Sequence, residues 1–366
     1  MKIGILTFHR AENFGAVLQA YALQQYLVSC GYNAIVIDYR CKSIERVYHL
    51  YNLSVLVKRR NIFKSSFEYV KRYRRLSDRK TKKLKYNDFR NKYLQLTSSV
   101  YKIKRPLDFD IYIVGSDQVW NLELLNGMNK IFFLSFPIKK CAKKISYAAS
   151  SDKGSYRLFE KYKDRISQSL NDFDAISVRE NELRDEMRKY TNKDITVCVD
   201  PTFLLEKQDY EKLAVKPLES KYILVYHMAE TPEGVVLANE IAKTKNLKVI
   251  EIHSIFSSNT DKSRHKQNIG PLELLGYIQY SEMIITTSFH GLALSLILQK
   301  EVWIMNKTNS ARLKNLLNIV GLQRRLIHDR TSYIDEEIDY SLVQEKLNVE
   351  ILLSKNYIKS TLINNN

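Results

Sequence analysis

Apolar residues recur along the chain in short runs that alternate between two spacings. At the start, a β-like run over residues 2–7 precedes a helical pattern over 16–29 and a second β-like run over 32–39. Gly31 separates that helix from the second strand. The chain is therefore predicted to open with a β-α-β unit, the building block of a parallel sheet.

The alternation continues along the first half of the chain. Strand-like runs are predicted at 109–114, 144–149, 175–178 and 196–199, with a helix at 156–170. Residues 203–220 break the pattern and indicate a crossing between two domains. A second α/β series follows, with elements at 221–227, 232–245, 247–253, 271–280, 283–287, 292–299, 302–305 and 312–320.

These patterns predict two doubly wound α/β domains. We expect an N-terminal domain over residues 1–205, a second domain over 206–340, and a C-terminal helix and tail over 341–366, with helical periodicity from 340 to 362. A length of 366 residues agrees with two domains, because one hydrophobic core rarely serves so long a chain.

The composition favours a cytoplasmic protein. Its four cysteines, Cys30, Cys41, Cys141 and Cys198, show no paired spacing, which argues against a disulfide framework and against a zinc site. The apolar N-terminus has no cleavage-like site and is interpreted as a core strand. No uninterrupted apolar run approaches the length that spans a membrane.

The net charge of +18 is concentrated in an insertion predicted at residues 42–104 of the first domain. Between Lys58 and Lys92 there are 15 lysines and arginines against three acidic residues, interleaved with aromatic and aliphatic side chains. This pattern is typical of basic amphipathic helices, which favour anionic membrane surfaces. A solvated helical hairpin explains it equally well, and no nucleic-acid-binding motif is present.

The stretch around His290 is the strongest candidate for chemistry. An apolar strand at 283–287 ends in Ser288-Phe289-His290-Gly291, and an apolar helix follows. In an open parallel sheet such a turn lies at the carboxyl end of the strand, where ligands bind. The helix N-terminus beside it favours an anion. A capping or half-buried histidine without chemistry is the equally weighted alternative.

Two further turns offer polar side chains at strand ends. Ser116, Asp117 and Gln118 follow the strand at 109–114 and bear a hydroxyl, a carboxylate and an amide, groups suited to a polyol. Arg179 follows the strand at 175–178, where a guanidinium suits a carboxylate or a phosphate. An ordinary helix cap and a surface salt bridge are the respective alternatives.

The early turn through Asn13 and Gly15 lacks the glycine-rich dinucleotide fingerprint. This absence counts against a nicotinamide or flavin enzyme.

Together these motifs resemble the polysaccharide pyruvyl transferase family from the first strand to about residue 322. The resemblance rests on six segments in the order of the family: Asn13-Phe14-Gly15 with Leu18-Gln19-Ala20-Tyr21-Ala22-Leu23, Gly115-Ser116-Asp117-Gln118-Val119-Trp120-Asn121, Tyr147-Ala148-Ala149-Ser150, Ser177-Val178-Arg179-Glu180, Asp200-Pro201-Thr202 and Thr287-Ser288-Phe289-His290-Gly291.

The resemblance implies two Rossmann-like domains facing a cleft, as in glycosyltransferases of the GT-B type. It also implies transfer of a pyruvyl group from phosphoenolpyruvate to two hydroxyls of one sugar, forming a cyclic ketal. Some members carry an arginine where this chain has Ser288, and Arg312 is the natural substitute for it.

On this basis we assign roles to ten residues. His290 and Asp117 are the expected catalytic residues. The expected donor-binding residues are Arg179, Ser288, Gly291 and Arg312, and the expected acceptor-binding residues are Asn13, Gly15, Ser116 and Gln118.

The expected partners are phosphoenolpyruvate, a glycan or lipid-linked sugar, and an anionic membrane surface contacted through residues 58–92, but not nucleic acid. No cofactor or metal is expected, because ketal formation needs neither and no metal-ligand cluster is visible. Two alternatives stay open. One is a GT-B glycosyltransferase that uses a nucleotide sugar, and the other is a non-enzymatic scaffold of polysaccharide assembly.

Overall fold

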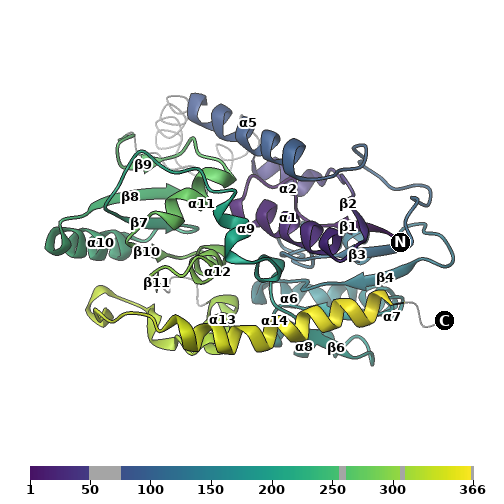
Figure 1. The fold of residues 1–366 in the computed structure, drawn as a ribbon. Coiled ribbons are helices and arrows are strands. Elements are labelled where there is room, and N and C mark those ends of the chain that lie inside the picture. Colours follow the sequence, from purple (N-terminus) through teal and green to yellow (C-terminus); the bar gives the residue numbers. More distant parts are fainter. Residues whose placement is uncertain (49–75, 255–260, 306–309, 364–366) are drawn as a thin grey trace, which may run out of the picture.

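The computed structural model describes residues 1–48, 76–254, 261–305 and 310–363, which form two α/β domains (Figure 1). The sheet of the first domain is parallel, with the strand order β2 (Asn33–Val36), β1 (Lys2–Leu6), β3 (Ile111–Val114) and β4 (Lys143–Ser146). The parallel pair β5 (Ile176–Val178) and β6 (Ile195–Val197) continues it through single bridges from Ile145 to Ala175 and from Ala149 to Val178.

The second domain contains a larger parallel sheet. Its strand order is β12 (Leu326–Ile327), β11 (Val302–Met305), β10 (Met283–Thr286), β7 (Tyr222–His227), β8 (Lys248–His253) and β9 (His265–Lys266). The four central strands are close to their predicted positions, since each is rich in buried apolar residues. The edge strands β9 and β12 were not predicted, because two residues are too few to show a periodicity.

Helices connect the strands and cover the sheets. Those before the second sheet are α1 (Phe14–Ser29), α2 (Lys42–Val47), α5 (Leu76–Tyr93), α6 (Lys153–Phe159), α7 (Lys163–Asn171), α8 (Asn181–Met187) and α9 (Lys207–Glu211). Those after its first strand are α10 (Pro232–Lys245), α11 (Pro271–Gln279), α12 (Phe289–Ile297), α13 (Ala311–Val320) and α14 (Tyr340–Leu362). Helices α10 and α14 begin and end where the sequence predicted.

Several helices differ from the prediction. Helix α1 begins two residues before the predicted 16–29, and α8 and α9 were not predicted. The helix expected at 156–170 is divided into α6 and α7 by a 3₁₀ turn at Glu160–Tyr162. Helix α12 begins three residues earlier than predicted, because the Ser288 hydroxyl caps it by accepting a hydrogen bond from the N–H of Gly291 (3.2 Å). His290 therefore lies in the first turn of α12.

The two domains share an apolar joint. Phe14 of α1 packs against Tyr86 of α5, with ring centroids 5.5 Å apart, and against Tyr226 of β7 at 5.9 Å. All three rings are fully buried in the hydrophobic cluster that also forms one side of the second domain's core. Burial of such rings typically stabilises a structure by about 1.5–3 kcal/mol each, so this contact fixes how the domains face one another.

Helix α14 joins the domains a second time (Figure 1, yellow). Its start contributes Val343 and Leu347 to the cluster of the second domain, whereas its end contributes Ile358 and Leu362 to the first. The Tyr357 hydroxyl donates a hydrogen bond to the carbonyl of Ser146 on β4 (2.9 Å). The chain thus returns to the domain in which it began.

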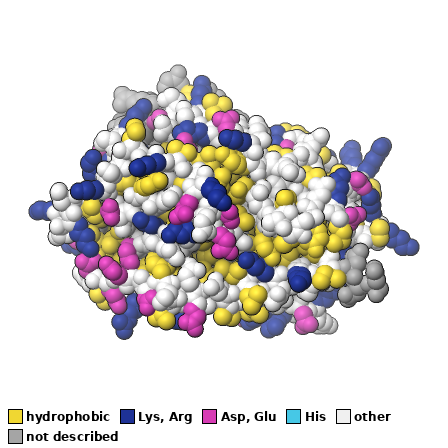
Figure 2. All heavy atoms as spheres, in the orientation of Figure 1, with side chains coloured by type: hydrophobic (Ala, Val, Ile, Leu, Met, Phe, Trp, Pro, Cys, Tyr) yellow, Lys and Arg dark blue, Asp and Glu magenta, His cyan; other side chains and the backbone are white. Residues whose placement is uncertain are grey.

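The predicted basic insertion is only partly described, since residues 49–75 lie outside the described ranges. Its later part is α5, which packs across both domains. Lys82 donates hydrogen bonds to the carbonyls of His253 and Ser254 (3.2 and 3.0 Å), and Lys85 pairs with Glu273. Part of the basic charge therefore bonds to the second domain and is not a solvated face. Elsewhere, basic and acidic side chains are mixed on the surface in Figure 2.

Within the described residues, no helix has the length and apolarity needed to cross a membrane.

We predict that the end of α14 is needed for the stability of the first domain. Ile358→Ala should lower the free energy of unfolding by about 2–5 kcal/mol, because it leaves a cavity in a packed core. Leu352→Ala on the same helix is the matched control, because Leu352 is 59% exposed whereas Ile358 is 4% exposed. Urea unfolding compares the two, and equal effects would contradict the packing described here.

Candidate active site

A cavity of about 310 Å³ lies between the two domains, at the carboxyl ends of their strands. Side chains of both domains line it. The polar ones are Asn13, Asp117, Gln118 and Asp152 from the first domain and Thr287, His290, Ser310 and Arg312 from the second. Two Rossmann-like domains facing a cleft are the GT-B-like arrangement that the sequence predicted. The prediction that Asp117 and Gln118 lie across this cleft from His290 is also confirmed.

His290 of the second domain lies beside a carboxylate of the first. Its Nε2 atom is 3.5 Å from Oδ2 of Asp200, and both side chains are buried, with 6% and 0% exposed. Asp200 follows β6 and is fixed by the backbone N–H of Thr202, which donates to its Oδ1 (3.1 Å). The contact is electrostatic, because Nε2 of His290 has no hydrogen-bond partner among the described residues. A negative charge on this side favours a proton on Nε2.

Arg179 forms an ion pair with Asp200. Its Nη1 donates to Asp200 Oδ2 (2.5 Å), its Nε to Glu180 Oε1 (3.0 Å) and its Nη2 to Ser150 Oγ (3.0 Å). The guanidinium also stacks on the ring of Phe289, at 4.4 Å from the centroid. Arg179 therefore makes a buried salt bridge, whereas the alternative considered from the sequence was a surface one.

Burial and ion pairing set the pKa values of this group. Burial opposes ionisation of Asp200, but the nearby His290 and Arg179 outweigh it and hold its pKa below the ordinary value. Burial likewise opposes the charge of Arg179, yet Glu180 and Asp200 raise its pKa above the usual range. Glu180 shows the opposite balance, because burial raises its pKa more than Arg179 lowers it.

Gly15, at the start of α1, packs directly on the His290 ring. A Cβ atom on residue 15 would lie 2.0 Å from Nδ1 of His290, far inside van der Waals contact. Glycine therefore lets the two domains meet here, because any side chain at this position would overlap the ring. Asn13, two residues earlier, caps α1 by accepting from the N–H of Ala16 and donates to Ser254 of the second domain (both 3.2 Å).

Arg312 brings a cation to the cavity. It is the one arginine or lysine among the cavity-lining side chains of the described residues. When the Gln118 amide oxygen faces it, that oxygen accepts from both Nη atoms of Arg312 (2.8 and 2.7 Å). Burial and the neighbouring Arg179 lower the pKa of Arg312, although Glu180 and Asp117 oppose this shift. The guanidinium is thus partly desolvated and fixed by a neutral amide.

Asp117 has a left-handed backbone, with φ at 69°. Its Oδ1 accepts a hydrogen bond from the N–H of Gln118 (2.8 Å). A non-glycine residue in this region costs on the order of 1–3 kcal/mol and is typical of functional turns.

The structure brings together five of the ten predicted site residues in the cavity lining: His290, Asp117, Arg312, Asn13 and Gln118. The other five lie behind that lining. Ser288 caps α12 and is fully buried, Gly291 packs against Thr286 and Tyr226, and Ser116 lies 3.2 Å from Asp200. Gly15 and Arg179 contact His290 and Asp200. These five residues support the site in this structure, and their binding roles stay predictions.

Sequence reasoning did not name Asp200 as a site residue. It appeared only as the first member of an Asp-Pro-Thr motif that stops a strand. A carboxylate at a strand's carboxyl end was the available signal, but its histidine partner is 90 residues further along in the other domain. Tyr48 and Asp152, which also line the cavity, were missed as well.

We predict that Asp200→Asn lowers the free energy of unfolding by about 3 kcal/mol at pH 7, because it breaks a buried ion pair. The depressed pKa of Asp200 means that its contribution is fully present above the unfolded pKa, near 4, and is lost as the pH falls below it. The gap between wild type and variant, measured by urea unfolding, should therefore narrow as the pH falls below about 4.

Asp172→Asn is the matched control, since Asp172 is 57% exposed and its pair with Lys144 is 3.5 Å long. It should change the free energy of unfolding by less than about 0.5 kcal/mol. A gap for Asp200→Asn that stays unchanged down to pH 3 would contradict the assigned ionisation.

Comparison with solved structures finds distant similarities over nearly the whole chain. UDP-GlcNAc 2-epimerase from Neisseria meningitidis, bound to UDP-GlcNAc, matches with 12% identity and a TM-score of 0.47, covering 100% of this chain and 95% of that one. UDP-GlcNAc 2-epimerase from Methanocaldococcus jannaschii matches with 10% identity and a TM-score of 0.44, covering 96% and 93%. A glycosyltransferase from Rickettsia africae ESF-5 matches with 12% identity and a TM-score of 0.41, covering 99% of each chain.

No curated protein matches the chain. The family model described as polysaccharide pyruvyl transferase, however, matches residues 13–306, which include the cavity-lining turns at Asn13, Asp117 and His290. The chain belongs to the polysaccharide pyruvyl transferase family.

Proposed function

We propose that this protein transfers a pyruvyl group from phosphoenolpyruvate to two hydroxyls of one sugar, in a surface polysaccharide or its lipid-linked precursor. The product is a cyclic ketal. The observation that carries the proposal is the His290–Asp200 pair in the cleft of a chain that belongs to this family. Membership of the family supports a transferase acting in polysaccharide pyruvylation, and the donor and the ketal are our inference.

The reaction balances without a cofactor. The methylene carbon of the donor accepts a proton and becomes a methyl group, while the enol carbon forms a C–O bond to the first sugar hydroxyl. The bond between that carbon and the phosphate oxygen then breaks, and the second hydroxyl forms the other C–O bond. The two sugar hydroxyls release two protons. One of them balances the proton that the methylene carbon gains, and the other leaves with inorganic phosphate.

His290 is proposed as the acid–base group. Asp200 faces Nε2, so the tautomer that it favours leaves the lone pair on Nδ1, the atom beside Gly15. A proton can then be exchanged at Nδ1, with the buried carboxylate stabilising the imidazolium that forms. A positioned acid–base group of this kind contributes a rate enhancement of about 10²–10⁴-fold.

Arg312 and the N-terminus of α12 are proposed to bind the donor's anionic groups. A guanidinium binds a phosphate or a carboxylate through two parallel hydrogen bonds. The helix N-terminus adds a partial positive charge at the position of His290. Arg179 was expected in this role, but its three kinds of nitrogen already bond to Asp200, Glu180 and Ser150. We therefore place Arg312 first.

Asp117 and Asn13 are proposed to face the sugar. Both line the cavity from the first domain, opposite His290 and Arg312 of the second. A carboxylate and an amide accept and donate the hydrogen bonds that sugar hydroxyls require. Asp117 can also accept a hydroxyl proton as the C–O bond forms, which agrees with the catalytic role expected for it.

The basic segment at residues 58–92 is proposed to bring the enzyme to an anionic membrane surface, where a lipid-linked acceptor would be found. Each basic side chain close to such a surface contributes about 1 kcal/mol. In α5, Lys82 bonds to the His253 carbonyl and Lys85 pairs with Glu273. Attraction to the membrane surface must therefore come from other basic residues of the segment.

A panel of free and lipid-linked sugars, incubated with phosphoenolpyruvate, tests the reaction. We expect phosphate release that depends on the acceptor, together with a product whose mass exceeds that of the acceptor by one pyruvyl ketal. The same panel with nucleotide sugars tests the glycosyltransferase alternative. Turnover of nucleotide sugars in place of phosphoenolpyruvate would refute the proposed reaction and favour the glycosyltransferase alternative. Turnover of neither donor would refute it and favour the scaffold alternative.

We predict that His290→Ala stays folded, with a modest loss of thermal stability because Asp200 keeps its bond to Arg179. It should lose turnover by about 10²–10⁴-fold, because the acid–base group is removed. Phosphate release and thermal unfolding are measured on the same preparation. His328→Ala, at an exposed position of the second domain, is the control and should match the wild type. Collapse of stability with normal activity per folded molecule would instead assign His290 a structural role.

We predict that Arg312→Lys raises the KM for phosphoenolpyruvate by about tenfold or more. The substitution retains the charge but loses the planar fork, and a charge-assisted hydrogen bond is worth about 1.5–3 kcal/mol. Steady-state kinetics against the donor measures it, with Arg324→Lys at an exposed position as the control.

Arg179→Lys separates the two arginines. Loss of stability or of kcat with an unchanged donor KM would mean that Arg179 positions Asp200. A donor KM raised as much as in Arg312→Lys would mean that Arg179 contacts the donor.

A further inference from the structure

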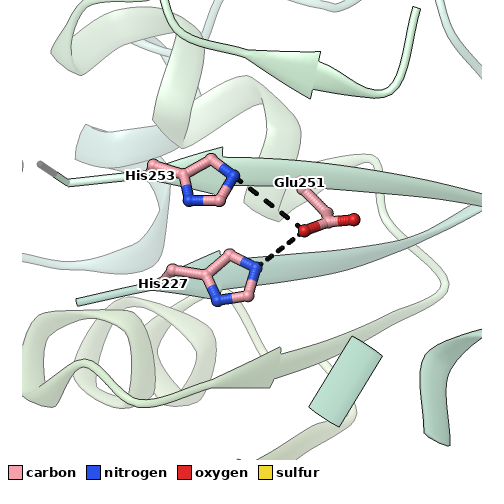
Figure 3. A group of neighbouring side chains, drawn as sticks. All are labelled: His227, Glu251 and His253. Carbon is pink, nitrogen blue, oxygen red and sulfur yellow. Dashed lines mark hydrogen bonds and ion pairs between the residues drawn. The ribbon is translucent and has the colours of Figure 1, made fainter. Parts of the chain in front are cut away.

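Three buried side chains that can bind a metal converge in the second domain. His227 ends β7, and Glu251 and His253 are the fourth and sixth residues of the neighbouring strand β8 (Figure 3). The strands pair in parallel, with His227 opposite His253. All three side chains are at most 5% exposed, and their nearest ligating atoms lie within 4.8 Å of one another.

The separations fit a small divalent cation. His227 Nε2 is 3.0 Å from Glu251 Oε2, and His253 Nε2 is 3.9 Å from the same oxygen. Zinc binds such atoms at about 2.0–2.2 Å in a tetrahedron, which places them about 3.3 Å apart. The buried Nδ1 of His265 on β9 is 3.1 Å from His253 Nε2 and 3.8 Å from Glu251 Oε2, and is the neighbouring candidate for a fourth ligand.

The groups around the cluster are those that support metal ligands. Glu230 accepts a hydrogen bond from Nδ1–H of His253 (2.9 Å), which leaves the lone pair of Nε2 directed toward the cluster. Arg264 donates to the other oxygen of Glu251 (2.5 Å).

His227 faces the cluster through one ring edge only. His227 gives its Nε2 edge to Glu251, and its buried Nδ1 has no hydrogen-bond partner among the described residues. The rings of His227 and His253 stack with centroids 4.5 Å apart and 7° between their planes. The parallel stack places both Nε2 atoms on the side of Glu251 (Figure 3).

We propose that His227, Glu251 and His253 bind a divalent cation of the zinc class, with His265 as the additional ligand. This site is separate from the cavity, since none of these four residues lines it. Its place in the fold indicates a structural role, because the cation would join the carboxyl ends of β7 and β8 to the start of β9. The inference does not depend on the proposed transfer reaction.

The clamp would fix one wall of the cleft. Met228 and Ala229, directly after His227, donate backbone hydrogen bonds to Oγ1 of Thr287 (3.0 and 3.1 Å), and all three residues line the cavity. Ser254, directly after His253, accepts a hydrogen bond from Asn13 of the first domain. A cation at the cluster would therefore hold both segments in place beside the substrates.

Metal binding is tested on the full-length, tag-free protein after removal of metals with a chelator and dialysis. Zn²⁺ is titrated against a chromophoric competitor, and bound metal is counted by mass spectrometry. Co²⁺ is added in parallel, because its visible absorption reports a four- or five-coordinate site with nitrogen and oxygen ligands. We expect about one equivalent of Zn²⁺, a visible Co²⁺ spectrum, and a melting temperature several degrees higher with Zn²⁺ than without it.

Matched variants locate the site. Glu251→Gln and His253→Asn should lose the bound equivalent and the shift in melting temperature, whereas His328→Asn should behave as the wild type. Glu230→Gln removes only the supporting carboxylate, which is largely exposed, and should weaken Zn²⁺ binding by about 10–100-fold while the protein stays folded. Glu233→Gln, nearby in α10, is its control.

Either of two outcomes would overturn the proposal. Less than a tenth of an equivalent of Zn²⁺ bound to the wild type at micromolar concentration would mean that the three side chains form a hydrogen-bonded stack without a metal. Unchanged binding in Glu230→Gln and Glu251→Gln would place the metal elsewhere, for example on the exposed Cys30 or Cys141. The readout on the wild type and on Glu230→Gln does not require the core variants to fold.

Discussion

The ionic chain from Arg179 through Asp200 to His290 is the interaction on which the site depends. Its first two members belong to the first domain and the third to the second, so the chain exists only when the domains are docked. Burying a carboxylate alone would cost several kcal/mol, and Asp200 is tolerated because a guanidinium and an imidazole lie on either side of it. Domain docking and the assembly of the His290–Asp200 pair are therefore one event.

The apolar contacts between the domains supply the energy for this docking. The ring of Phe14 packs against those of Tyr86 and Tyr226. Helix α14 adds a second contact, because its Ile358 and Leu362 are buried in the core of the first domain. These contacts are non-directional, whereas the ionic chain needs correct distances. The apolar joint therefore stabilises the docked state, and the contact of Gly15 with His290 sets how closely the domains approach.

The sequence predicted what depends on local pattern. Buried strands such as β7 and β11 and the helices α10 and α14 were placed within a residue or two, since hydrophobic periodicity and end signals determine them. It also placed Asp117 and His290 at strand ends that face one cleft. What depends on pairing between distant segments was missed. Asp200 and its histidine come from different domains, and the cluster of His227, Glu251 and His253 forms only when β7 and β8 pair in register.

Ser288 has a structural role at the start of α12. Its hydroxyl caps α12, is fully buried and accepts from Gly291, so a side chain that must reach the cavity cannot come from this position without opening the helix start. The cation is instead supplied by Arg312, two residues into α13, and is oriented by Gln118 of the opposite domain. Because the charge lies on one domain and its orienting amide on the other, the anion binding proposed for Arg312 depends on domain docking, as the His290–Asp200 pair does.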